Sequence, residues 1–201
     1  MQEFIHLYKA GILPQTLLLL HGTGGDETQL MELGVQVLPG ANLLGVRGRV
    51  SEKGANRFFR RFEEGVFDRE DLIFRTGELA GFVKSAANRY GFDPMQVYAL
   101  GYSNGANIGA ALLLLHPETL AGGALLHAQI PLTPDVLSDL SGKRILITAG
   151  KRDAIVSPAQ AEGLRKMLQE RHVEVELWQH EGGHEISISE LEKVGEWLES
   201  L

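Results

Sequence analysis

Six short apolar runs alternate with longer helical patterns along this chain, and this alternation limits its fold more than any other feature. The runs span residues 16–20, 42–46, 96–100, 123–126, 144–148 and 174–178. All but the last continue without alternating polar residues, which is typical of parallel strands buried on both faces. The helical patterns cover residues 27–37, 72–90, 104–116, 158–171 and 187–201. The alternation predicts a doubly wound, mostly parallel sheet with helices on both faces.

Length and charge narrow the class of protein. The 201 residues suit one domain, residues 1–201, with a sizeable core. With 26 acidic and 19 basic residues, the net charge is −7, which argues against nucleic acid or an anionic membrane as the main partner. No apolar run approaches the ~20 residues that span a bilayer, and the first residues lack a signal-peptide pattern. We therefore expect a cytoplasmic protein with no membrane partner.

A serine motif follows the third apolar run. Residues 101–105 read Gly-Tyr-Ser-Asn-Gly, between a predicted strand and a predicted helix. In this context G-x-S-x-G predicts a nucleophile elbow, in which the serine has a strained backbone and an exposed hydroxyl. Gly101 and Gly105 fit that prediction because the turn is too tight for a Cβ on either side. Ser103 is therefore the candidate nucleophile.

An acid and a base follow the last two runs. Asp153 comes after the run 144–148 and is the candidate acid, although a turn or helix-cap role is the alternative for an isolated aspartate there. Of the two histidines after the run 174–178, we assign His180 to the rim or surface and His184, behind two glycines, as the candidate base. The chain order serine, aspartate, histidine is that of α/β-hydrolases.

A glycine-rich segment follows the first run. Residues 21–26 read His-Gly-Thr-Gly-Gly-Asp. A tetrahedral intermediate needs fixed donors for its oxyanion, and in this fold one backbone N–H comes from this loop and one from the residue after the nucleophile. We assign these donors to Thr23 and Asn104. A phosphate cradle is the alternative, but the segment fits neither common phosphate motif. His21 is expected to fix the loop.

Residues 47–71 form the longest stretch without a clear pattern and contain four phenylalanines. A loop of this length in a compact domain is usually functional. Phe58 and Phe59, nearest the preceding strand, are predicted to form a wall of the acyl pocket. Phe62 and Phe67 are predicted to anchor the loop to the core.

Two further features concern the pocket and its access. Ile155 and Val156, two and three residues after the candidate acid, are predicted to contact substrate. Residues 127–142 separate the fourth and fifth runs, which is too few for a cap domain.

No cofactor is expected. The chain has no cysteine, which excludes thiolate chemistry and cysteine-ligated zinc. His6, His116, His127 and His172 show no ligand spacing, so we expect them at the surface or at helix ends rather than around a metal.

Taken together, the motifs at residues 20–26, 101–105, 150–156 and 182–185 resemble the phospholipase/carboxylesterase family of compact α/β-hydrolases, over nearly the whole chain. The resemblance implies the α/β-hydrolase fold without a cap domain. It also implies Ser103 as nucleophile, Asp153 as acid and His184 as base, with Thr23 and Asn104 forming the oxyanion hole. Acyl-protein thioesterases are relatives within this group.

The chain also departs from that pattern. The eukaryotic-type thioesterases usually carry glutamine after the nucleophile, where this chain has Asn104, and the loop reads Thr23-Gly24-Gly25 instead of Leu-Gly. The chain is therefore more similar to the bacterial esterase branch. Dienelactone hydrolases share the fold but usually employ a cysteine nucleophile.

These features predict a serine carboxylesterase that hydrolyses small carboxylic esters through an acyl-enzyme. An acyl thioesterase or lysophospholipase, an aminopeptidase, and a small-molecule-binding protein without turnover are the alternatives, because a triad and an oxyanion hole serve any acyl transfer. From the resemblance we also expect that two copies can form a homodimer.

Overall fold

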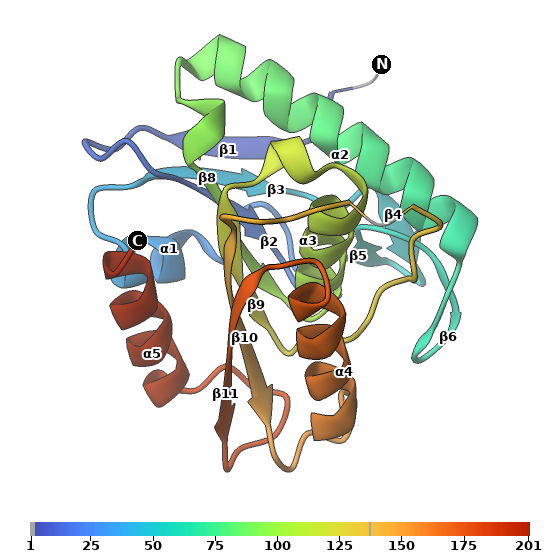
Figure 1. The fold of residues 1–201 in the computed structure, drawn as a ribbon. Helices are drawn as coiled ribbons and strands as arrows, with labels where there is room; N and C mark the ends of the chain where they lie inside the picture. The colour runs from blue at the N-terminus through green and yellow to red at the C-terminus, as the bar shows by residue number, and fades with distance from the viewer. Residues whose placement is uncertain (1–2, 137) are drawn as a thin grey trace.

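A seven-stranded sheet forms the centre of the computed structural model, which describes residues 3–136 and 138–201 (Figure 1). Its strand order is β1-β3-β2-β8-β9-β10-β11. The strands are β1 (His6–Lys9), β2 (Thr16–Leu20), β3 (Asn42–Val46), β8 (Val97–Tyr102), β9 (Gly122–Leu126), β10 (Arg144–Gly150) and β11 (Glu174–His180). Only β1 runs antiparallel to its neighbour, and the other adjacent pairs are parallel. The predicted doubly wound, mostly parallel sheet is confirmed.

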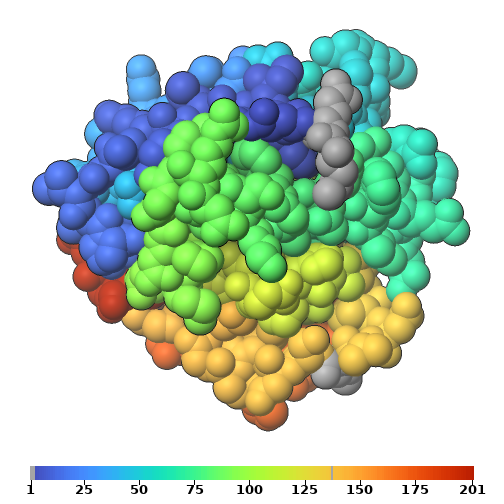
Figure 2. All heavy atoms as spheres, turned by 90° about the horizontal axis from the view of Figure 1, so that it is seen from above, coloured from blue at the N-terminus to red at the C-terminus, as the bar shows by residue number. Residues whose placement is uncertain are grey.

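Helices cover both faces of the sheet. On one face lie α1 (Met31–Val37) and α5 (Ile188–Glu199), and on the other lie α2 (Arg69–Tyr90), α3 (Asn104–Leu115) and α4 (Pro158–Gln169) (Figure 1). Two hydrophobic clusters fill the two layers. Figure 2 shows α2, in green, across the outside of its layer. Short 3-10 turns, η1 (Pro94–Gln96) and η2 (Pro117–Thr119), precede β8 and β9.

The strand sequences explain their positions. All five residues of β2, Thr-Leu-Leu-Leu-Leu, are buried because β3 and β8 flank this strand and helices cover it on both sides. In contrast, β11 alternates exposed and half-buried residues, as expected for the edge of the sheet. This explains why the last apolar run is the one that alternates.

The predicted helices are all present, with differences at their ends. The largest difference is at α1, which begins at Met31 because the residues before it form turns. There the Asp26 carboxylate accepts hydrogen bonds from the N–H and hydroxyl of Thr28, at 2.9 and 2.6 Å. A side chain that satisfies the local backbone in this way favours a turn over a helix.

The prediction of an irregular loop at residues 47–71 is wrong. The segment forms two small hairpins, β4 (Val50–Glu52) with β5 (Ala55–Arg57) and β6 (Arg61–Glu63) with β7 (Val66–Phe67). Each strand has only two or three residues, too few to establish a sequence period. The four-residue strand β1 was missed for the same reason.

The described residues between β9 and β10 form no cap domain. Between the end of β9 and the start of β10, residues 127–136 and 138–143 contain no helix or strand. No helix or strand from these residues therefore covers the carboxyl ends of the central strands.

Within the part of the chain that the structure describes, no helix is both long enough and apolar enough to span a bilayer.

The start of α2 supplies a test of local stability. Asp68 is the N-cap of this helix, and its carboxylate accepts a hydrogen bond from the N–H of Asp71 at 3.1 Å. Asp68→Ala is expected to lower the free energy of unfolding by about 1 kcal/mol, because the first turn loses its side-chain acceptor. Asp68→Asn, which can still cap, is the control. Urea unfolding of both variants measures the difference, and equal losses would contradict the capping role.

Candidate active site

Ser103 lies in a tight turn between β8 and α3. Its backbone angles are φ 52° and ψ −113°, and its N–H donates to the carbonyl of Leu126 at 2.8 Å. A Cβ on Gly105 would lie 2.0 Å from the carbonyl oxygen of Leu20, and one on Gly101 would lie 2.8 Å from the backbone of Ala106. The turn thus has the strained serine and the glycines that the sequence predicts.

Three side chains from the ends of three strands meet at this turn. The Nε2 atom of His184 lies 2.8 Å from the Oγ of Ser103, and its Nδ1 lies 2.7 Å from the Oδ2 of Asp153. Because Nδ1 faces a carboxylate, it carries the ring proton, which leaves the Nε2 lone pair for the serine hydroxyl. The structure therefore brings all three predicted residues together in hydrogen-bond contact.

Asp153 is buried and held from both sides. Its Oδ2 atom faces His184. Its Oδ1 atom accepts hydrogen bonds from the backbone N–H groups of Ile155 and Val156, at 2.8 and 2.9 Å. Burial alone would raise the pKa of this carboxyl, but these hydrogen bonds outweigh burial and the pKa is lowered. The group is therefore a carboxylate at neutral pH.

His180 is not part of this contact. Its Nδ1 accepts the N–H of Gly182 at 3.1 Å, and its Nε2 faces Glu190, 3.9 Å from that carboxylate. The ring is buried, so the prediction that His180 lies at the rim or surface is wrong. The strand β11 continues two residues beyond the apolar run 174–178 and ends at His180. His180 therefore lies within the sheet, and its side chain is buried.

His21 fixes the loop before α1, as predicted. Its Nε2 accepts the N–H of Gly48 at 2.9 Å, so Nδ1 carries the proton and donates to the carbonyl of Gly22 at 2.6 Å. Burial lowers the pKa of His21, which keeps the ring neutral.

Thr23 and Asn104 flank the serine. Asn104 is the first residue of α3, where backbone N–H groups have no partner within the helix. Its side-chain oxygen accepts the N–H of Phe58 at 2.8 Å. Thr23 is exposed, and its hydroxyl accepts a hydrogen bond from the buried Arg57 at 2.6 Å. Side-chain contacts thus hold both residues in place beside Ser103.

A small groove of about 40 Å³ opens beside Ser103. Its wall includes the two predicted contacts, Ile155, which is exposed, and Val156, which is buried. Arg57 and Arg61 also line the groove, and they share a single carboxylate, that of Glu52, at 3.2 and 3.1 Å. The groove is therefore small, with both apolar and basic parts.

Three of the four phenylalanine predictions are wrong, whereas the prediction that Phe67 anchors the segment to the core is confirmed. Phe58 and Phe59 are fully buried core residues and do not line the groove, whereas Phe67 lines it and packs edge-on against Phe59 at 5.0 Å. Phe62 is 77% exposed and anchors nothing. The hydrogen bond between Phe58 N–H and the Asn104 side chain draws the chain beneath α3, where the Phe58 ring packs on His21.

Sequence reasoning also missed two residues behind Asp153. His127 is fully buried, with Nδ1 2.9 Å from the Asp153 carboxylate, so its prediction as a surface or helix-end residue is wrong. Glu190, from the first turn of α5, is equally buried and faces His127 at 3.4 Å. His127 directly follows β9, and this position at the carboxyl end of a central strand is the signal that could have found it.

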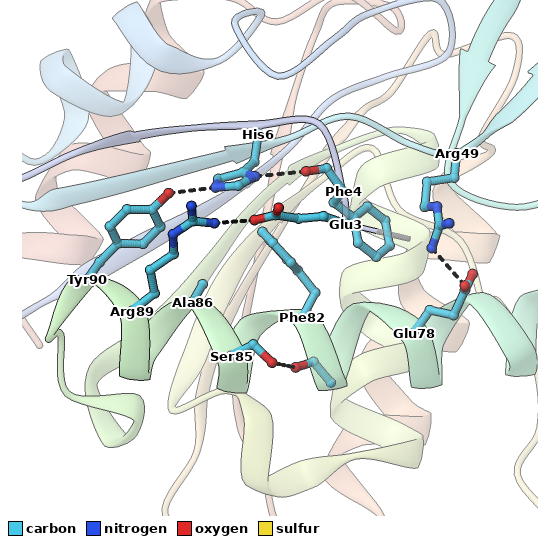
Figure 3. A pocket seen from close by; sticks show the side chains of 11 residues that line it. Glu3, Phe4, His6, Arg49, Glu78, Phe82, Ser85, Ala86, Arg89 and Tyr90 are labelled. Atoms are coloured by element: carbon cyan, nitrogen blue, oxygen red, sulfur yellow. Dashed lines mark hydrogen bonds and ion pairs between the residues drawn. The ribbon is translucent and has the colours of Figure 1, made fainter. Parts of the chain in front are cut away.

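A larger hollow of about 310 Å³ lies elsewhere, between the N-terminal segment and α2 (Figure 3). Its polar groups pair with one another. Arg49 donates to Glu78, and the His6 ring contacts Tyr90 Oη at 2.7 Å. It shares no lining residue with the groove beside Ser103 and is therefore a separate feature of the surface.

Comparison with known proteins places this geometry in a family. The model of the dienelactone hydrolase family matches residues 67–185, which include Ser103, Asp153 and His184. The chain belongs to this family. Unlike the cysteine expected for dienelactone hydrolases, a serine stands at the elbow here.

Individual proteins similar to this chain are also named hydrolases or carboxylesterases. The chain is 43% identical over 192 residues to "Putative hydrolase MhqD" of Bacillus subtilis, covering 96% of each protein. It superposes on the crystal structure of the Bacillus cereus carboxylesterase with a TM-score of 0.96 and 43% identity, covering 98% of this chain and 94% of that one. It is also 32% identical to "Carboxylesterase SOBER1" of Arabidopsis thaliana, over 54% of this chain and 50% of that protein. The predicted branch of the α/β-hydrolase superfamily is confirmed.

Proposed function

We propose that this protein is a serine carboxylesterase that hydrolyses small carboxylic esters through an acyl-enzyme. The observation that carries the proposal is the continuous contact from Ser103 Oγ to His184 Nε2 at 2.8 Å and from His184 Nδ1 to Asp153 Oδ2 at 2.7 Å. A nucleophile, a base within hydrogen-bond reach and a third group that orients the base are the parts that nucleophilic acyl transfer requires.

Acylation begins when Ser103 Oγ attacks the ester carbonyl carbon and its proton passes to His184 Nε2. The carbonyl oxygen becomes an oxyanion, which the backbone N–H groups of Thr23 and Asn104 stabilise. The Asp153 carboxylate faces the imidazolium that has formed and holds it in orientation. His184 then gives its proton to the alkoxy oxygen, the ester C–O bond breaks, and the alcohol leaves the acyl-enzyme.

Deacylation repeats these steps with water as the nucleophile. His184 takes a proton from water as its oxygen attacks the acyl carbon. The same donors stabilise the second oxyanion, and the proton returns to Ser103 Oγ as the acyl–serine bond breaks. The carboxylic acid leaves, and the enzyme is restored. One water is consumed, and the chain's own residues carry every proton.

The relatives support ester chemistry over other acyl transfers. Two proteins similar to this chain are named carboxylesterases, and a third is named a hydrolase. Their names place the chain among the carboxylic ester hydrolases. No comparable observation favours thioesters or peptides.

The groove supports short acyl groups. Its volume of about 40 Å³ leaves little room, and the Phe67 ring closes part of it. In an apolar site each methylene that does not fit costs about 1 to 3 kcal/mol of transition-state binding. We therefore propose that esters of up to about six acyl carbons are preferred, with Phe67 in the role that the sequence assigned to Phe58 and Phe59.

Nitrophenyl esters with acyl chains from acetyl to palmitoyl test both parts of the proposal. The wild type should release a burst of nitrophenol equal to the enzyme concentration and then turn over, with kcat/KM highest for short chains. Phe67→Ala should move the maximum to longer chains, because it enlarges the groove. Phe62→Ala, the same change at an exposed ring on the same hairpin, is the control and should leave the profile unchanged.

Two results would contradict the proposal. Binding without any release of nitrophenol would identify a protein without turnover. Highest activity on the longest chains, or a Phe67→Ala profile identical to wild type, would remove the assignment of the short groove. Values of kcat/KM measured in parallel on thioester and anilide substrates compare the carboxylesterase with the thioesterase and aminopeptidase alternatives.

A further inference from the structure

His127 lies directly behind the Asp153 carboxylate, on the side away from the groove. Its Nδ1 lies 2.9 Å from the same oxygen, Oδ2, that faces His184. The residue follows the last residue of β9 in a left-handed backbone conformation with φ 54°, and its ring has no exposed surface. An ordinary side chain avoids this conformation, so the surrounding structure holds His127 there at a cost in strain.

Glu190 faces the other ring nitrogen of His127. Its Oε1 lies 3.4 Å from His127 Nε2, an ion-pair distance, and the hydroxyl of Thr148 donates to the same carboxylate oxygen. Its Oε2 accepts the N–H of Ser187 at 3.2 Å. The Glu190 side chain has no exposed surface. One imidazole ring therefore lies between two buried carboxylates.

The number of ring protons decides the charge of His127. A neutral imidazole has one N–H and would leave a bare nitrogen against one of the two carboxylates, whereas an imidazolium presents an N–H to each, to Asp153 at hydrogen-bond distance and to Glu190 at ion-pair distance. Burial lowers the pKa of His127, but the hydrogen bonds and charges of Glu190 and Asp153 outweigh it, and the pKa is raised. The pKa of Glu190 is lowered for the complementary reason, because its contacts with His127 outweigh the effect of burial.

Other elements also bring titratable groups toward His127. They are Asp153 after β10, His184 after β11, His180 at the end of β11, Tyr102 at the end of β8, and Glu190 on α5. His180 and Glu190 could complete a three-ligand metal site with His127. The N–H of Gly182 donates to His180 Nδ1, so the ring proton of His180 is on Nε2, the atom that a metal would need. This proton disfavours a metal at that position.

We propose that His127 is a buried imidazolium that, held by Glu190, positions the triad carboxylate and offsets part of its charge. The inference rests on the proposed function only for its effect on catalysis. With His127 charged, the two carboxylates and the imidazolium carry a net charge of −1, which the imidazolium of His184 neutralises during acyl transfer. His127 does not touch substrate and acts through Asp153.

The positive charge has a predictable effect on the pH profile. The rings of His127 and His184 have centroids 5.0 Å apart, so a charge on the first opposes protonation of the second. Loss of that charge makes the triad base easier to protonate, and a higher pH is then needed to free it. The acid limb of kcat/KM, which reports the base of the free enzyme, should therefore move to higher pH.

Three variants test this effect. His127→Asn keeps an N–H near the position of Nδ1 and tolerates the left-handed backbone, but it has no charge. Its acid limb should move up by about one pH unit. Glu190→Gln can still accept the N–H of Ser187 but removes the partner that keeps His127 charged. Because it removes one negative charge together with the positive charge of His127, its upward shift should be smaller than that of His127→Asn, and the double variant should shift no further than His127→Asn alone.

Ile145→Val is the matched control for stability, since it trims a fully buried residue of β10 without touching the network. It should lower Tm and leave the pH profile unchanged. A purely structural role for His127 predicts the same behaviour for His127→Asn, namely a lower Tm with an unmoved acid limb. That result, additive shifts in the double variant, or a downward shift in Glu190→Gln would overturn the proposal.

NMR of ¹⁵N-histidine-labelled protein tests the charge without any substrate. The His127 signals, identified by their loss in His127→Asn, should show two protonated ring nitrogens at pH 7 in wild type and one in Glu190→Gln. A neutral His127 in wild type would refute the inference. Absence of ester turnover alongside a charged His127 would instead refute the proposed function, so the two failures are distinguishable.

Discussion

Ser103→Ala should lower kcat on nitrophenyl acetate by about a million-fold, the loss seen when the nucleophile of a serine hydrolase is removed. The variant keeps the oxyanion donors and the groove but has no oxygen 2.8 Å from His184 Nε2 to form the acyl-enzyme. The burst of nitrophenol should disappear together with turnover. Alanine removes only a hydroxyl, so the circular dichroism spectrum should match that of the wild type.

His180, the last residue of β11, and His184, in the loop after that strand, provide the comparison. His184→Ala should lose about as much activity as Ser103→Ala, because residues of a triad act as a unit. His180→Ala should retain most of its activity, since the ring contacts neither Ser103 nor Asp153, although loss of a buried ring will lower Tm. An inactive His180→Ala beside an active His184→Ala would reverse the assignment of the base.

Much of this site could be predicted because one physical rule governs it. Parallel strands end at the same edge of the sheet, so residues directly after them meet even when they are 81 positions apart, as Ser103 and His184 are. The glycines at positions 101 and 105 mark a turn that admits no Cβ. Both features are visible in short stretches of sequence. The order of the strands in the sheet then determines which of these stretches lie next to one another.

The groove could not be predicted in the same way. Which of four phenylalanines faces Ser103 depends on two hairpins whose strands are too short to show a period. It also depends on a hydrogen bond from Phe58 N–H to Asn104, two residues 46 positions apart. No pattern within residues 47–71 encodes that contact, so the sequence does not show that Phe58 and Phe59 lie in the core, or that Phe67, which packs against the core, also lines the groove.

The network behind Asp153 was missed for a different reason. His127 obeys the strand-end rule, but a histidine alone has no recognisable partner in the sequence. Its partner Glu190 occupies the position of an ordinary capping-box residue at the start of α5, where a glutamate needs no further explanation. Only the packing of α5 beneath the sheet reveals that this glutamate is buried against His127.

Asp153→Asn should lower kcat by about 10,000-fold, as in triads in which the acid becomes an amide. Oδ1 of Asp153 accepts two backbone N–H groups, so the amide oxygen must occupy that position, and the amide nitrogen then takes the place of Oδ2. An N–H would then face the Nδ1 atoms of both His184 and His127, where both rings donate in the wild type. His184 must shift its proton to Nε2, and it can no longer accept the proton of Ser103.

The same substitution should change the dependence of stability on pH. The pKa of Asp153 is lowered in the folded protein, so its contribution is present above the unfolded value of about 3.9 and is lost as pH falls through the folded pKa. Asp153→Asn should therefore be destabilised most at pH 7, and the difference from wild type should shrink in acid.

Asp135→Asn is the matched control for both measurements. This carboxylate is exposed, and its ion pair with Arg69 at 2.8 Å contributes little in water. The control should keep wild-type kcat and a wild-type pH dependence of urea unfolding. If Asp153→Asn behaved like this control in turnover, the carboxylate would not be orienting His184, and the acid of the triad would have to be sought at Glu190, the other buried carboxylate of the network.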